Sequence, residues 1–181
     1  MSRLVFPCIP LWLLLTLGGC DNKDDDPYNP VDALPAITQS GAQTLGCLID
    51  GEPFIPSNIG TRRPSAFYQF VDGTFTLSIS GATGGGSSKS IIISGLDING
   101  TSEDTFPLQD RGSGRYSARY IIGGGIEEQA ETSSTNPGAL TITRFDQEAF
   151  IVSGVFEFTA VGRDGTIYTI TEGRFDLNYT N

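Results

Sequence analysis

The chain has 181 residues, with 21 acidic and 11 basic side chains, a formal net charge of −10 and no histidine. A surface with this excess of negative charge argues against DNA, RNA and anionic lipid headgroups as direct partners, because each of them is itself an anion. The absence of histidine excludes Ser-His-Asp and Cys-His catalytic machinery, and it removes the usual ligands for zinc, copper and non-haem iron. We therefore predict no cofactor and no metal site.

An apolar run opens the chain. Arg3 precedes residues 4–17, which are apolar apart from Thr16 and are interrupted by Pro7 and Pro10. A helix needs roughly 20 apolar residues to span a bilayer, so this run is too short for a membrane anchor. A basic start, a short apolar core and small residues at its end are typical of a cleaved secretory signal.

The end of that run is its most informative part. Leu17-Gly18-Gly19-Cys20 resembles the lipobox of bacterial lipoproteins. The resemblance implies that the chain is cut after Gly19, leaving residues 1–19 as the signal peptide. It also implies that Cys20 becomes the new N-terminus and carries diacylglycerol and palmitate-like acyl chains, which attach the protein to a membrane. The alternative is an ordinary cleaved signal followed by a chance cysteine.

Residues 20–37 have the composition of a tether. Five aspartates against one lysine, together with Pro27, Pro30 and Pro35, predict an extended, solvated segment that holds the cargo off the bilayer. The acidic cluster at residues 21–26 resembles the export signal of Bacteroidetes surface lipoproteins. It implies an outer-membrane protein exposed on the cell surface, with the periplasmic face of that membrane as the alternative.

Cys47 is the one cysteine of the cargo, because Cys8 leaves with the signal and Cys20 carries the lipid. A single thiol cannot form an internal disulfide, so we expect the domain to rely on packing. Cys47 alternates with Leu45 and Ile49, which predicts a buried, unreactive side chain.

Residues 38–181 predict a single all-β domain. Short alternating runs rich in Val, Ile, Thr, Phe and Tyr recur between turn signals. This favours an antiparallel β-sandwich of about eight to ten strands joined by hairpins, with a small closed antiparallel barrel as the alternative. The predicted strands are residues 44–49, 67–71, 74–80, 90–95, 115–122, 138–145, 151–160 and 166–175, with short additions at 52–55 and 176–179.

Three Asp-Gly pairs, at residues 50–51, 72–73 and 164–165, predict tight hairpins, because this pair tolerates positive φ at both central positions. Beyond the last pair the apolar positions change from even to odd numbers. A shift of one residue would reverse the inward face, so we predict a β-bulge at Glu172-Gly173 and place this hairpin at the core of the sheet.

Two sets of carboxylates are candidates for chemistry. A glycosidase needs two carboxylates across a cleft, and Glu157 and Glu172 are expected on neighbouring strands. A second group, Glu127, Glu128 and Glu131, lies in a polar stretch, residues 127–137, that we expect to be an exposed loop. Solvated surface charges are the simpler interpretation of both sets.

Oxygen-bearing side chains also follow the predicted strand at residues 90–95. Asp97 and Asn99, with Glu103 and Asp104, would suit a calcium ion, although the spacing departs from the EF-hand loop. Asn99-Gly100 alone explains the stretch as a turn, and we assign no metal ligand to it.

Glycan binding and anion binding leave weaker signals. Trp12 lies in the signal, so a sugar-stacking platform would have to use tyrosines of the cargo. The candidates are Tyr68, Tyr116, Tyr120, Tyr168 and Tyr179, and alternation is expected to bury some of them. Arg115 and Arg119 flank Tyr116 and could receive an acidic partner. The glycine-rich stretches at 81–89 and 123–125 lack the lysine and threonine of a phosphate loop, and we interpret them as hairpin loops.

Three stretches together carry a family resemblance: residues 38–56, residues 138–146 with 153–160, and residues 170–177. They resemble a family of uncharacterised Bacteroidetes lipoproteins that is described as a domain of unknown function. The resemblance implies an exported, lipid-anchored β domain and brings no catalytic residue. We expect a non-catalytic domain that binds a protein or another extracellular ligand, with a glycan-binding module and a carboxylate-pair hydrolase as alternatives. The ligand and the oligomeric state stay open.

Overall fold

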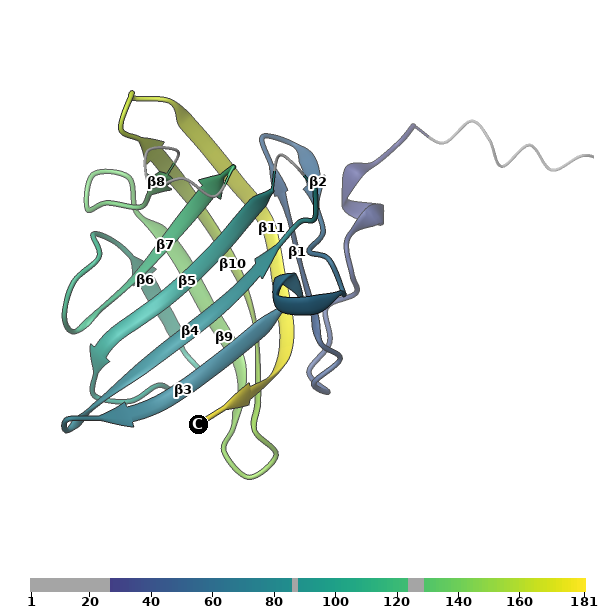
Figure 1. Ribbon diagram of the computed structural model, residues 1–181. Helices are drawn as coiled ribbons and strands as arrows, with labels where there is room; N and C mark the ends of the chain where they lie inside the picture. The colour runs from purple at the N-terminus through teal and green to yellow at the C-terminus, as the bar shows by residue number, and fades with distance from the viewer. Residues whose placement is uncertain (1–26, 86–87, 124–128) are drawn as a thin grey trace, which may run out of the picture.

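The computed structural model describes residues 27–85, 88–123 and 129–181, and in them the chain is all-β (Figure 1). Two short 3-10 turns, η2 (Pro30–Ala33) and η3 (Gly60–Arg62), accompany the strands. The strands are β1 (Thr44–Ile49), β2 (Glu52–Phe54), β3 (Ser65–Val71), β4 (Thr74–Ala82), β5 (Lys89–Ile98), β6 (Thr105–Leu108), β7 (Arg115–Ile122), β8 (Gln129–Glu131), β9 (Gly138–Asp146), β10 (Ile151–Gly162) and β11 (Ile167–Thr180).

The strands form a closed, mixed barrel rather than a sandwich. The hydrogen-bonded order β11-β3-β4-β5-β7-β6-β9-β10 returns to β11, because β10 also pairs with β11. A sandwich needs two separate sheets, so the preferred architecture was wrong and the barrel alternative fits better. Three strands lie outside the ring: β1 and β2 continue from β11, and β8 pairs with both β7 and β10.

The pairings that close the barrel are the ones that hairpin signals do not reveal. Strand β11 runs parallel to β3 over two register pairs, Tyr179 with Ala66 and Thr180 with Phe67. Strand β6 runs parallel to β7 at Leu108 and Tyr116. The first contact joins segments far apart in the chain, and the second joins consecutive strands in a parallel direction that a hairpin cannot produce. The predicted purely antiparallel arrangement was therefore also wrong.

The strand predictions agree closely with the structure. The ranges at 44–49 and 115–122 are confirmed residue for residue, and seven more, the short one at 52–55 included, differ at their ends by a few residues. The predicted short strand at residues 176–179 is the continuation of β11. Strands β6 and β8 were missed, and β8 occupies part of the stretch that was expected to be a loop.

Alternation places the core inside the barrel. Phe156, Phe158 and Ala160 of β10 are buried, while Glu157 between them is exposed. Cys47 is fully buried, and burial raises the pKa of its thiol to about 12, so it stays protonated and inert at neutral pH. The expectation of a packed, unreactive cysteine is confirmed.

The predicted hairpin turns and the bulge are present. Asp50-Gly51 and Asp72-Gly73 have positive φ at both residues, whereas Asp164 does not and only Gly165 is left-handed. The third turn is therefore a hairpin of a different type. Glu172 has a φ of 54°, and the registers of β11 with both β10 and β1 shift at this point, which confirms the bulge.

The last part of the predicted tether lies against the barrel. Residues 30–33 form η2 instead of an extended chain, and the Leu34 side chain is buried. The ring of Pro35 packs on Gly46 of β1, where a Cβ would come within 2.6 Å of it. Cys20, Asp24, Asp25 and Asp26 lie outside the described residues. Within the described ranges, no helix is long and apolar enough to cross a bilayer.

Candidate functional site

Aromatic side chains gather at one end of the barrel. A groove of about 490 Å³ lies there between the edge of β3, the β9–β10 turn and the end of β11. Figure 1 shows that the β3–β4 turn, the β9–β10 turn and the C-terminal end of β11 share this end, away from the point where the described chain begins. We call it the aromatic groove; it is lined by Tyr68, Gln69, Phe70, Val71, Phe75, Gln147, Phe150, Tyr179 and Asn181.

The rings form one connected stack. Tyr68 stacks on Phe75 with centroids 4.7 Å apart and nearly parallel planes, and the tilted ring of Phe70 also packs on Phe75 at 4.7 Å. Tyr179 meets Tyr68 edge-on at 6.0 Å and Phe150 at 5.7 Å. The two tyrosines are buried, whereas Phe70, Val71 and Phe150 are 63%, 56% and 43% exposed. A buried aromatic floor therefore carries an exposed apolar rim.

The β9–β10 turn holds Phe150, one residue of this rim, in place. Asp146 caps the β9–β10 turn by accepting hydrogen bonds from the amides of Glu148 and Ala149 at 3.0 and 2.8 Å, and Arg144 pairs with its carboxylate at 2.6 Å. The turn ends on Phe150, whose φ of 55° is unusual for a bulky residue. The amide of Tyr179 donates to the Phe150 carbonyl at 2.8 Å and fixes this conformation.

The polar side chains that line the groove are neutral. Gln69, Gln147 and Asn181 supply side-chain amides, and no carboxylate, cysteine or cationic side chain is among the residues that line it. Burial raises the pKa of Tyr68 and of Tyr179, so both hydroxyls stay protonated at neutral pH. The side chains that line the groove suit an uncharged or apolar ligand group, and none of them is suited to proton transfer or nucleophilic attack near pH 7.

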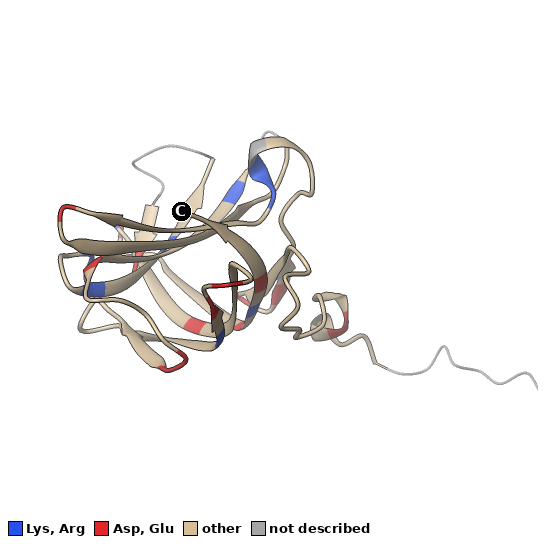
Figure 2. Ribbon diagram, turned by 90° about the horizontal axis from the view of Figure 1, so that it is seen from below, with Lys and Arg blue, Asp and Glu red and all other residues tan. Residues whose placement is uncertain are grey.

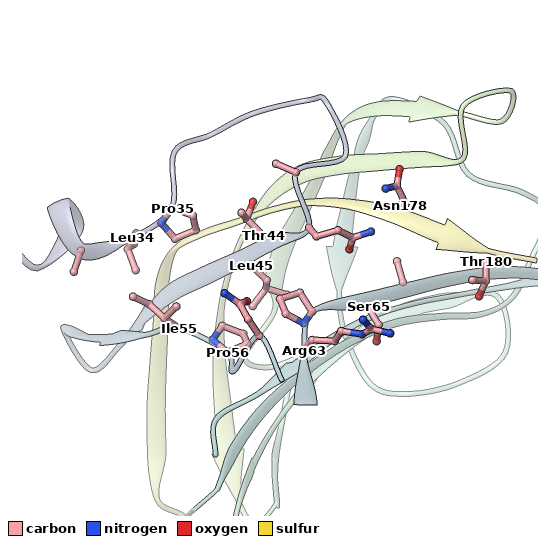
Figure 3. Close-up of a pocket in the computed structure, with 16 residues that line it drawn as sticks. Leu34, Pro35, Thr44, Leu45, Ile55, Pro56, Arg63, Ser65, Asn178 and Thr180 are labelled. Carbon is pink, nitrogen blue, oxygen red and sulfur yellow. The ribbon is translucent and has the colours of Figure 1, made fainter. Parts of the chain in front are cut away.

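A larger groove of about 780 Å³ follows the seam between β1, β3 and the segment that leads into β1 (Figure 3). Its walls are mainly small and apolar side chains, with Leu34, Pro35, Ile55 and Pro56 among them, and Arg63 is the one charged residue in its lining. Polar side chains such as Gln43, Asn58 and Asn178 also line it, but no aromatic side chain does, and none of the exposed apolar rings described above belongs to it. We therefore place the candidate site at the aromatic groove.

The structure brings the predicted carboxylate pair to one place. Glu157 of β10 and Glu172 of the β11 bulge line the same shallow pocket of about 320 Å³ on the outside of the barrel. The Glu172 side chain is 52% exposed and forms an ion pair with Arg174 at 2.9 Å. Two exposed carboxylates on an open surface do not form the water-excluding cleft that glycoside hydrolysis requires. Glu131 lies in β8, and Glu127 and Glu128 lie outside the described residues.

The acidic oxygen-bearing residues at the end of β5 and beyond it accept hydrogen bonds from the protein itself. Asp97, with a φ of 49°, accepts a hydrogen bond from Thr74 at 3.3 Å. Asp104 accepts from the amide of Thr105 at 2.7 Å, and Glu103 accepts from the amide of Phe145 at 3.3 Å. Across the described part of the chain, no group of three or more His, Cys, Asp or Glu side chains is placed to hold a metal ion.

The other three candidate tyrosines pack in or against the core. Tyr116 and Tyr120 are buried, and Tyr168 packs partly buried against Tyr120 at 5.0 Å. The expectation that alternation buries some of the tyrosines is confirmed. Figure 2 shows the acidic positions distributed over turns and strands instead of gathered in one patch.

One charged residue inside the structure was missed from the sequence. Asp176 of β11 is 1% exposed, although it lies on the outer face of the barrel. Residues 38–42, which we call the strap, cover it: the amides of Ser40, Gly41 and Ala42 donate to its carboxylate at 2.8, 2.8 and 3.1 Å. The hydroxyls of Thr38 and Ser153 add bonds of 2.6 and 2.7 Å.

These bonds decide the ionisation of Asp176. Burial alone raises the pKa of its carboxyl, but the hydrogen bonds from Thr38, Ser153 and the strap amides outweigh burial and hold the pKa well below its usual value. Arg144 ties the strap further by donating to the Gln39 carbonyl. Asp176 is therefore ionised at neutral pH, and its hydrogen bonds hold the strap against β11.

Comparison with known proteins gives no further guide. No family model matches the chain, and neither a curated protein nor a solved structure matches it.

Proposed function

We propose that this protein is a lipid-anchored lipoprotein of the outer membrane, exposed on the cell surface, whose barrel is a non-catalytic binding domain. The anchor is proposed from the lipobox-like residues that end in Cys20. The observation that carries the binding role is the aromatic groove, where exposed Phe70, Val71 and Phe150 surround a buried aromatic floor. Contiguous apolar side chains on the surface of a small protein mark interaction sites, because leaving them in water is unfavourable.

The lack of catalytic equipment in the groove supports a binding role over a hydrolase. The residues that line it include none of the carboxylates that the sequence suggested for chemistry. Glu157 and Glu172 lie elsewhere, on the outside of the barrel. The glycan alternative draws support from the three amide side chains beside the rings, but the two tyrosines are buried and the exposed rings belong to phenylalanines.

The anchor is tested by mass spectrometry of the mature N-terminus and by Cys20→Ser in a Bacteroidetes host. We expect diacylglycerol and acyl chains on Cys20, and loss of membrane retention or of cleavage in the variant. An unmodified thiol at the mature N-terminus would refute the anchor. Replacing Asp24, Asp25 and Asp26 by Ala should protect the domain from external protease on intact cells if this cluster directs export to the surface.

The binding role is tested with the full processed chain in a mild detergent. A peptide display library and a neutral glycan panel are screened in parallel, and every binder is re-measured against Phe70→Ala and Phe150→Ala. Exposed apolar residues outside the groove serve as matched controls in Ile59→Ala and Ile167→Ala. Binding that falls tenfold or more in the groove variants and stays unchanged in the controls supports the proposal, and binding insensitive to both groove substitutions contradicts it.

A further inference from the structure

The larger of the two grooves lies where strand β11 changes partners. Strand β1 pairs with β11 as far as Thr44 and Asp176, and β3 pairs with it from Tyr179 and Ala66 onward. The groove of about 780 Å³ lies at this change, between the start of β1, the start of β3 and the segment that precedes β1, and we call it the seam groove (Figure 3). Its volume is in the range of pockets that hold small organic ligands.

The seam groove has an apolar floor and a polar rim. Leu34, Leu45 and Ala66 are buried members of its lining and form the floor. The exposed members of the lining include amide and hydroxyl side chains: Gln43, Asn58, Ser65, Asn178 and Thr180. A floor of this kind receives the apolar part of a ligand, and a polar rim orients its polar part.

Among the described residues that line the seam groove, Arg63 alone is charged. The chain has a net charge of −10, so its surface as a whole repels anions, and a wall with a cation and without a carboxylate is a local exception. In the described part of the chain, the ion pairs join Arg144 to Asp146 and Arg174 to Glu172, and neither uses Arg63. The guanidinium of Arg63 is therefore available to an anion from outside.

The backbone of Arg63 is held in place on both sides. Arg63 follows the 3-10 turn η3 with a φ of −60° and a ψ of 154°, and a residue that precedes a proline is restricted to such extended angles. That proline, Pro64, is buried, and the next residue, Ser65, begins the ladder of β3 with β4. Figure 3 shows Arg63 beside Ser65, with Asn178 of β11 on another wall of the groove. A fixed backbone lowers the entropic cost of pairing with a ligand.

We propose that the seam groove binds a small organic monocarboxylate with an apolar body. Arg63 pairs with the carboxylate, because a guanidinium donates two parallel hydrogen bonds that match the two oxygens of this group. One cation in the lining suits one negative charge, whereas a phosphate group would bring up to two. The apolar body lies on the floor formed by Leu34, Leu45 and Ala66. This site is separate from the aromatic groove and does not depend on the binding role proposed there.

Carboxylic acids and their primary amides test the role of the charge. Hexanoate, cinnamate and phenylpropionate are titrated calorimetrically into the full processed chain in a mild detergent, and the corresponding amides are titrated under the same conditions. Each amide keeps the apolar body but carries no charge. We expect at least one acid to bind, its amide to bind at least tenfold more weakly, and the affinity of the acid to fall with added salt. Equal affinities of acid and amide, or no binding by any of the acids, would overturn the inference.

Two arginine variants with the same change in charge test the location. Arg63→Gln removes the guanidinium that lines the groove, whereas Arg62→Gln removes an exposed guanidinium one residue earlier that is not part of the lining. We expect the affinity for a bound acid to fall tenfold or more in Arg63→Gln, to recover in part in Arg63→Lys and to stay unchanged in Arg62→Gln. Both arginines are exposed, so urea unfolding should find the variants as stable as wild type. Equal losses in Arg62→Gln and Arg63→Gln would assign binding to the overall charge and refute the site.

The chain's own acidic segment is the competing occupant, and the same titration tests it. Residues 21–26 carry four aspartates and lie outside the described residues. With Asp24, Asp25 and Asp26 all replaced by Ala, we expect the bound acid to keep a similar affinity. Binding that appears only in this variant would assign Arg63 to the acidic segment and overturn the inference.

Discussion

Asp176 and Tyr179 are three residues apart on β11, and their surroundings are built in opposite ways. Asp176 has every approach covered by the strap, and its charge is satisfied by backbone amides and hydroxyls of the same chain. Tyr179 faces a groove whose rim exposes Phe70, Val71 and Phe150. The polar groups around Asp176 are satisfied within the chain, whereas the apolar side chains beside Tyr179 are exposed at the proposed binding site.

The comparison separates a stretch of β11 that stabilises the fold from the stretch beside the proposed binding site. A buried carboxylate is tolerated only when hydrogen bonds replace water, so the strap has to be in place for β11 to fold correctly. The groove has no such requirement, because its exposed rings are in contact with solvent. Substitutions around Asp176 should therefore affect stability, and substitutions around Tyr179 should affect binding.

The largest effect is expected for Asp176→Ala. This change leaves the hydroxyls of Thr38 and Ser153 and three strap amides without their acceptor. Leaving a buried donor without its acceptor costs about 1–3 kcal/mol, and several donors lose their acceptor here, so we expect a loss of about 3 kcal/mol or more in the free energy of unfolding measured in urea. Asp164→Ala, at an exposed carboxylate that bonds only within its own turn, is the control and should shift the midpoint little. Equal losses in the two variants would show that the strap adds no stability.

Gly173→Ala should have the next largest effect, because it adds an atom to the bulge. A Cβ at this position would clash with the backbone oxygen and the ring of Phe156. Overpacking of this kind costs about 1–3 kcal/mol, to be measured by urea unfolding. Gly112→Ala is the matched control, since its nearest neighbour is Arg115 at 3.8 Å and its backbone is not left-handed. A stable Gly173→Ala would indicate that the bulge can relax.

The third effect concerns pH. The pKa of Asp176 is lowered in the folded state because the hydrogen bonds from Thr38, Ser153 and the strap outweigh the opposing effect of burial. A lowered pKa means that the ionised carboxylate stabilises the fold above the unfolded-state pKa of about 3.9, and that this stability is lost as pH falls below it. We expect the difference in unfolding free energy between wild type and Asp176→Asn to be constant from pH 7 to 5 and to shrink below pH 4. A difference that does not change down to pH 2 would contradict the linkage.

The strands, hairpins and bulge were predicted from the sequence, whereas closure of the barrel was not, and the difference has a physical reason. Strands and hairpins were predictable because alternation and Asp-Gly turns are local signals, and the bulge at Glu172-Gly173 followed from a change in the inward face. Closure of the barrel was not predictable, because it depends on the parallel contacts of β11 with β3 and of β6 with β7. Neither pair of strands is joined by a hairpin turn, which is the local signal that predicts a pairing.

The sites follow the same rule. Asp176 resembles any surface residue of a strand, since its burial comes from a strap more than 130 residues away in the sequence. The aromatic groove combines β3, the β9–β10 turn and the end of β11, so no single stretch announces it. Tyr68 and Tyr179 were named as possible platform residues, and they do reach the groove, but as its floor. Phe70 alternates with Tyr68 and lies just before the Asp72-Gly73 turn, so its position at the open end of the barrel could have been predicted from the sequence.

The smallest effect on stability, with the largest on binding, is expected for Phe150→Gly. The ring packs on Tyr179, and this aromatic contact contributes about 0.5–1.5 kcal/mol beyond the apolar area that the ring buries. The φ of 55° is costly for phenylalanine and free for glycine, which returns about 1–2 kcal/mol. The relieved strain offsets much of the lost packing, so the urea midpoint should fall only slightly while affinity for a groove ligand falls tenfold or more. Phe150→Ala keeps the Cβ and therefore the strain, and it should be the less stable of the two variants. If Gly and Ala are equally stable, Phe150 is not strained. If affinity survives in both variants, the ring is not part of the binding surface.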